Sequence, residues 1–152
     1  MQNTISASDL PARGEPLAGG VFVTRYWLGD QERALVLLPD KLEGAWGDYG
    51  QKVETNHSDG EANTRAMAEA GSKIAKKAIE AGGHIPSCVE GHLLMAAKEE
   101  GLIALREDRF HWLSTQCSAH GAYGVDFENG WQDNNDKNLG RLVRPVRSLI
   151  IQ

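Results

Sequence analysis

FHWLSTQCSAHGAYGVDFENGWQDNNDKNLGRLVRPVR is the sequence of residues 110–147, the stretch that decides the fold we expect. It contains three apolar segments, FHWL, AYGVDF and LVRPVR, each bounded by polar turn residues. Short runs rich in β-branched and aromatic residues between such turns are typical of β-strands. They predict a C-terminal antiparallel sheet. Pro145 has no backbone N–H to donate, so we expect the last strand to be an edge strand or bulged at that residue.

The most polar part of the chain, residues 128–138, lies between the second and third of these segments. A tryptophan among side chains with adaptable hydrogen bonding is typical of partner-binding surfaces. We therefore predict a partner-binding loop. Its residues are Trp131, Gln132, Asp133, Asn134, Asn135, Asp136 and Asn138. In the alternative interpretation, Trp131 belongs to the core and the loop is only a solvated connection.

The N-terminal half predicts a β-hairpin followed by two helices. Residues 21–27 and 34–38 are apolar and β-prone, with a turn signal at 29–32. Residues 58–81 have apolar positions at helical spacing, a capping box of Ser58 and Glu61 at the start, and Gly82 with Gly83 at the end. Ser87 and Glu90 form a second capping box, and Gly101 ends the helix behind it.

This order of elements indicates an α+β domain, because the helices are segregated from the strands. Residues 40–57 predict an irregular surface loop that Trp46 and Tyr49 pin to the domain. Residues 1–18 lack periodicity and contain two prolines and a glycine. We expect residues 1–18 to be a flexible N-terminal arm that orders only against a partner, and residues 19–152 to be the folded domain.

The composition fits one globular domain and argues against several classes of partner. The chain has 152 residues, 41% hydrophobic and 24% charged, with a formal net charge of −5. Non-specific nucleic-acid binding requires clustered Lys and Arg, so we expect no nucleic-acid partner. No apolar run reaches the ~20 residues of a membrane-spanning helix, and the first residues do not resemble a signal peptide. We expect synthesis in a cytoplasm, with Cys88 and Cys117 as free thiols.

No group of residues makes a strong case for catalysis or for a cofactor. Cys117 and His120 are three apart, but nothing in the sequence supplies an orienting third group. The five histidines lack metal-ligand spacing. We therefore predict a non-enzymatic protein with no metal and no cofactor. Arg144 and Arg147 could contact an anion, but we expect one of them to pair with Asp126 or Glu128 across the sheet.

Several segments together resemble a known family. They are GGVFVTRYW with ALVLLPD, SDGEANTRAMAEAGSKIAKKA, IPSCVEGHLL, and FHWLSTQ with AYGVDFENGWQ and VRPVR. The chain resembles, over about residues 19–149, a phage- and prophage-borne family related to the C-terminal domain of a collagen-like bacterial adhesin. That family is similar to the C-type lectin-like fold. Where it usually carries a WYLPSRDEL-type segment, this chain keeps only Pro86, Ser87 and Glu90.

The resemblance implies a C-type lectin-like fold with an N-terminal β-hairpin, two helices and a C-terminal antiparallel sheet. Calcium-dependent lectins of this fold use a Trp-Asn-Asp triplet. This chain has Trp131, Gln132 and Asp133 instead, and Asx residues in loops most often bond their own backbone. We therefore favour a loop without calcium.

The expected function is that of a phage virion or tail-associated binding protein with a receptor-binding, adhesin-like or decoration role. Its partners would be other virion proteins or a host-surface protein or glycan, and we expect it to be a homo-oligomer located in the virion. The alternative is a small phage-encoded inhibitor that binds a host protein inside the cell.

Overall fold

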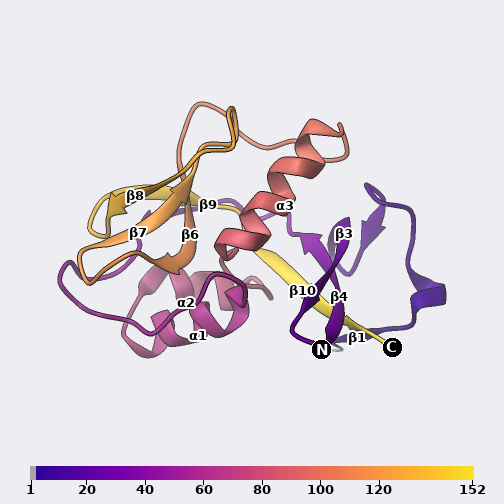
Figure 1. Cartoon of the computed structure of the whole chain (residues 1–152), viewed down its shortest axis with the longest axis horizontal. Helices are drawn as coiled ribbons and strands as arrows, with labels where there is room; N and C mark the ends of the chain where they lie inside the picture. The colour runs from indigo at the N-terminus through magenta and orange to yellow at the C-terminus, as the bar shows by residue number, and fades with distance from the viewer. Residues whose placement is uncertain (1–2) are drawn as a thin grey trace.

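A computed structural model describes residues 3–152 and shows a mixed α+β protein (Figure 1). Within those residues the chain forms three α-helices and two five-stranded sheets. Each sheet combines antiparallel pairs with one parallel pair, so both are mixed. The predicted α+β class is confirmed, whereas the C-terminal sheet is not purely antiparallel.

The first sheet is built around the predicted hairpin. Its strand order is β1-β10-β4-β3-β2. The strands are β1 (Thr4–Ile5), β2 (Pro16–Leu17), β3 (Gly20–Leu28), β4 (Gln31–Leu37) and β10 (Val146–Ile151). Gly29 connects β3 to β4 with φ of 64°, a left-handed conformation that glycine adopts without steric cost. The hairpin prediction is therefore confirmed.

The second sheet has the order β5-β9-β6-β7-β8. Its strands are β5 (Leu42–Ala45), β6 (His111–Gln116), β7 (Gly121–Val125), β8 (Gln132–Asp136) and β9 (Gly140–Val143). The last apolar segment, predicted as one strand, is divided at Arg144 and Pro145 into β9 and β10, which belong to different sheets. Pro145 thus marks the crossing between sheets, because it cannot donate to a ladder.

The helices are α1 (Gly60–Glu69), α2 (Lys73–Glu80) and α3 (Cys88–Glu99). The prediction of one helix over 58–81 is wrong. Gly71 has φ of 99° and interrupts it, and the Ser72 side chain accepts a hydrogen bond from the Ala75 N–H to begin α2. The N-cap of α1 is Asp59 rather than Ser58. The Ser87–Glu90 capping box of α3 and the left-handed Gly82 after α2 are confirmed.

The helices join the sheets into a layered core (Figure 1). α3 lies between the two sheets: Leu94 on α3 packs in one cluster with Val23 of β3 and Leu113 of β6. α1 and α2 cover the other face of the second sheet, where Met67 and Ile74 pack with Trp112. Ile79 of α2 and Val89 of α3 are apolar residues that nevertheless lie exposed.

The N-terminal segment is part of this core, so the prediction of a flexible arm over residues 1–18 is wrong for the residues that the structure describes. β1 pairs with β10 and β2 pairs with β3. Ile5, Leu10 and Leu17 pack against the face of the first sheet that α3 leaves uncovered. The segment orders against the chain's own sheet. Residues 1 and 2 of the predicted arm lie outside the described residues.

The segment 40–57, predicted as an irregular loop, contributes strand β5 to the edge of the second sheet. Trp46 is buried as predicted and donates its indole N–H to the Leu113 carbonyl over 2.8 Å. Tyr49, predicted to pin the loop as well, is exposed. No helix among residues 3–152 is both long and apolar enough to cross a membrane.

Candidate functional site

The predicted partner-binding loop is a strand over most of its length. Gln132 to Asp136 form β8, which pairs with β7 and lies at the edge of the second sheet. The prediction of a loop is therefore wrong for these five residues. Asn138 lies beyond the strand in the turn to β9 and is exposed. Because β8 is an edge strand with little cover, its side chains are polar on both faces and the sequence lacks the alternation that marks other strands.

The seven predicted residues do not form one continuous surface, because side chains alternate along a strand. Gln132, Asn134 and Asp136 lie on one face of β8, and Asp133 and Asn135 lie on the other. Gln132 is half-buried and donates to the Cys88 carbonyl at the start of α3 over 2.7 Å. Asn135 is half-buried and accepts from Arg141. These two residues join the strand to its surroundings and are less available to a partner.

Trp131 is the exposed centre of this region, with 70% of its surface accessible. This finding excludes the alternative in which Trp131 is a core residue. A tight turn positions it: the Gly130 N–H donates to the Asp126 carbonyl over 2.6 Å, and the Asp126 N–H donates to the Trp131 carbonyl over 2.8 Å. Gly130 has φ of 81°, and a Cβ there would lie 3.1 Å from Met95 of α3. The turn is thus fixed against the helix while the indole faces solvent.

The polar groups of β8 also satisfy each other. The Asn134 N–H donates to the Asp133 carboxylate over 2.8 Å, and the Asn135 amide donates to the Asp133 carbonyl over 3.1 Å. Local side-chain bonds of this kind compete with pairing to a further strand. Recognition through the side chains of this edge is therefore favoured over addition of a strand to it.

A second concentration of polar groups lies buried between the sheets, where Glu90 on α3 is only 1% exposed. Its carboxylate accepts from the Tyr26 hydroxyl over 2.7 Å, from the Ser87 N–H over 2.9 Å and from His84 Nε2 over 3.1 Å. The Tyr26 hydroxyl also lies 2.9 Å from the hydroxyl of Ser148. This centre links the first sheet, through Tyr26 of β3 and Ser148 of β10, to α3, and burial raises the pKa of Tyr26 far above its ordinary value.

His84 and Glu90 form a buried ion pair. Burial disfavours both charges, but the mutual attraction and hydrogen bonds outweigh it. The pKa of His84 is raised and the pKa of Glu90 is lowered. The sequence identified Glu90 only as a capping residue and gave no sign of His84.

Lys137, directly after β8, is fully buried. Its ammonium donates to the Gln51 carbonyl and to the Gln116 side-chain oxygen, both over 2.6 Å, and lies 4.7 Å from the centre of the Trp46 ring. Burial lowers the pKa of Lys137 to about 8. No pattern in the sequence separated this lysine from the surface lysines. Lys137 anchors the end of β8 to the core.

The other predicted functional residues are not brought together. Cys88 is buried and Cys117 is exposed, both as free thiols, and the His120 ring packs on Tyr49 with centroids 4.7 Å apart. The expectation that Arg144 or Arg147 pairs with Asp126 or Glu128 is wrong. Arg144 donates to the Leu38 carbonyl over 3.0 Å, and Arg147 donates to the Ala18 carbonyl over 2.7 Å. Within residues 3–152 no group of three or more His, Cys, Asp or Glu residues could hold a metal ion.

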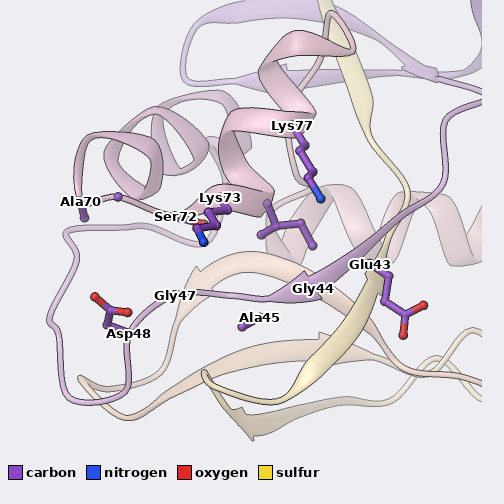
Figure 2. Close-up of a pocket in the computed structure, with 11 residues that line it drawn as sticks. Glu43, Gly44, Ala45, Gly47, Asp48, Ala70, Ser72, Lys73 and Lys77 are labelled. Atoms are coloured by element: carbon purple, nitrogen blue, oxygen red, sulfur yellow. The ribbon is translucent and has the colours of Figure 1, made fainter.

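A cavity of about 330 Å³ lies between β5 and the α1–α2 turn (Figure 2). Lys73 and Lys77 of α2 line one side, and Glu43 and Asp48 line the other. The Glu43 carboxylate already accepts from Arg109 over 2.8 Å. With opposite charges on its two sides, this cavity does not select a ligand of either sign.

Comparison with known proteins gives no further guide to this site. No protein-family model matches the chain, and no curated protein sequence matches it.

Proposed function

We propose that this protein is a non-enzymatic binding module of C-type lectin-like fold and a component of a phage virion or its tail. The observation that carries the binding role is the exposed Trp131 beside the polar edge strand β8. A tryptophan with 70% of its surface accessible exposes a large apolar area to water, which a partner would cover. We name the edge surface after the exposed residues that flank this edge on both faces of the strand, which are Trp131, Asp133, Asn134 and Asp136.

The fold and the habitat rest on the resemblance over residues 19–149. The arrangement of a hairpin, helices and C-terminal strands is compatible with a C-type lectin-like domain. β1 and β10 also run parallel side by side, so the two ends of the described chain emerge together (Figure 1). A domain with adjacent ends can be attached at one side while the opposite side faces a partner.

The charges around the edge surface favour a protein partner with basic side chains. Four carboxylates lie in or near this surface, those of Asp126, Glu128, Asp133 and Asp136. One cation, the half-buried Arg141, contacts β8 through Asn135. Acidic groups repel sulfated or phosphorylated glycans but attract Lys and Arg, and a guanidinium can stack on an exposed indole. A partner with an apolar recess and basic rim would therefore fit this surface.

Mass spectrometry of purified particles tests the virion role. A virion component should be present at many copies per particle. Its absence from particles would contradict the virion role, and its recovery in a defined complex with a host protein from infected cells would favour the alternative of a phage-encoded inhibitor.

A further inference from the structure

A second cavity, of about 350 Å³, lies at the junction of the two sheets. Its walls are the start of β5, the end of β9, the start of β6 and the segment 104–106 that crosses above them. None of these residues belongs to the edge surface, so the cavity is independent of the proposed function. Its volume falls in the range of about 300–1,000 Å³ that is usual for ligand pockets.

The lining combines an apolar wall with positive charge. Leu42, Leu105, Leu142 and Val143 form the apolar wall. Lys41, Arg106 and Arg144 supply the charged groups, and among residues 3–152 no acidic residue lines the cavity. The protein as a whole has a net charge of −5, so this concentration of cations departs from its average surface.

Two of the three cations lack an anionic partner within residues 3–152. Arg106 is paired with Asp108, whereas neither Lys41 nor Arg144 forms an ion pair. Arg144 donates one hydrogen bond, to the Leu38 carbonyl, and its buried Nε has no partner. Burial lowers the pKa of the Arg144 guanidinium, although it remains charged at neutral pH, and the charge of Asp40 opposes this effect. An anion would offset the cost of burying this charge.

His111 adds a neutral hydrogen-bonding group to the cavity wall. Its Nδ1 lies 3.2 Å from the Arg109 carbonyl, and its ring packs edge-on against Phe127 with centroids 4.9 Å apart. Burial, together with the charges of Arg144 and Arg106, lowers the pKa of His111 to about 4. The imidazole is therefore neutral at pH 7. With the Nδ1 proton donated to the carbonyl, Nε2 is left as a hydrogen-bond acceptor.

We propose that this cavity binds a small organic anion with a compact apolar body, whose carboxylate or phosphate group contacts Lys41 and Arg144. The apolar body would lie against Leu42, Leu105 and Leu142. Removing this body from water contributes affinity, and the charge contacts fix its orientation. A hydroxyl or N–H on the ligand would donate to His111.

Titration of the whole chain with benzoate, phenyl phosphate, benzamide and inorganic phosphate, followed by chemical shifts of the backbone amides, tests this proposal. Benzoate or phenyl phosphate should give saturable changes at Leu42, Leu105 and Leu142. Whichever of these two ligands binds more tightly shows whether the cavity prefers a carboxylate or a phosphate group. Neutral benzamide and inorganic phosphate, which has no apolar body, should each bind at least tenfold more weakly. Equal binding by benzamide, equal binding by inorganic phosphate, or no saturable change would overturn it.

Two variants locate the site. Lys41→Ala changes an exposed residue and should weaken binding of the better anion at least threefold with the fold intact. Arg144→Gln should weaken it further, and if this variant does not fold, Lys41→Ala decides. The matched control is Lys77→Ala, which removes a lysine from the cavity in Figure 2 and should leave binding unchanged. Equal affinity in Lys41→Ala and the wild type would contradict the assignment.

Discussion

The buried centre around Glu90 and the edge surface around Trp131 are both rich in polar groups, but their surroundings differ completely. Glu90 is 1% exposed and accepts hydrogen bonds from three other residues, whereas Trp131 is 70% exposed. Polar groups buried in a core must be satisfied, so the first centre specifies how α3 joins the first sheet. Exposed polar groups contribute little to stability. The first region therefore stabilises the fold, whereas the second contributes little to stability and is the surface that we propose for binding.

The largest expected effect is the loss of the Glu90 carboxylate. Glu90→Ala leaves the His84 charge buried without a partner and removes the acceptor of Tyr26, so the free energy of unfolding should fall by about 3–5 kcal/mol. Urea denaturation measures this. Glu90→Gln keeps the side-chain volume and separates the lost charge from the lost packing. A loss below about 1 kcal/mol for both variants would contradict a stabilising role for this centre.

The pH dependence of stability should reveal the same ion pair. The pKa of Glu90 in the folded protein lies below its ordinary 4.5. The contribution of Glu90 to the free energy of unfolding is therefore present above pH 4.5 and disappears as the pH falls through the folded pKa. The pKa of His84 in the folded protein lies above its ordinary 6.5. The contribution of His84 to the free energy of unfolding is therefore complete below pH 6.5 and disappears as the pH rises through the folded pKa. The stability difference between wild type and Glu90→Gln should therefore be largest between pH 4.5 and 6.5. A difference independent of pH would exclude the ion pair.

A smaller loss is expected when a methyl group is added beside the buried centre. A Cβ on Gly60, the first residue of α1, would lie 2.1 Å from Glu90 Oε1 and 2.8 Å from the Ile85 carbonyl oxygen. Gly60→Ala should cost about 1–3 kcal/mol, the usual range for overpacking. Gly47→Ala is the matched control, because nothing lies within 4 Å of a Cβ there. Equal melting temperatures for the two variants would show that the centre tolerates rearrangement.

Lys137 anchors the end of β8 to the core, and its effect on the pH dependence of stability should be smaller again. Its folded pKa of about 8 is below the ordinary 10.5, so the unfolded chain binds more protons between these values. The Lys137 contribution to stability should therefore rise with pH from about 8 to 10.5. Lys137→Met removes the charge at similar length and should lack this rise. Parallel pH profiles of denaturation midpoints for the two proteins would contradict the effect.

The sequence predicted the elements that local signals specify. Ser87 and Glu90 marked the start of α3, Gly82 marked the end of α2, and apolar runs marked the hairpin of β3 and β4. These signals act within a few residues of the chain, so no tertiary information is required to interpret them.

The errors arose where tertiary contacts decide. The interruption at Gly71 accompanies packing of α1 against β6 and of α2 against β5. The N-terminal segment is ordered because it covers a face of the first sheet that would otherwise be open. β8 was predicted as a loop, since an edge strand with exposed faces carries no apolar alternation. The role of Lys137 could not be predicted, because its acceptors at Gln51 and Gln116 are distant in the sequence.

Photo-cross-linking from the edge surface tests whether this surface binds a partner. A photoreactive amino acid would replace Trp131 in one protein and, as the matched control, the 64% exposed Trp27 in another. The free energy of unfolding of both proteins should lie within about 0.5 kcal/mol of the wild-type value, because each change is at the surface.

Assembled particles, alone and mixed with host cells, would be irradiated and the products identified by mass spectrometry. If the edge surface binds a partner, position 131 should give one dominant cross-linked protein and position 27 at least tenfold less product. Equal yields from the two positions, or no product from position 131, would contradict it.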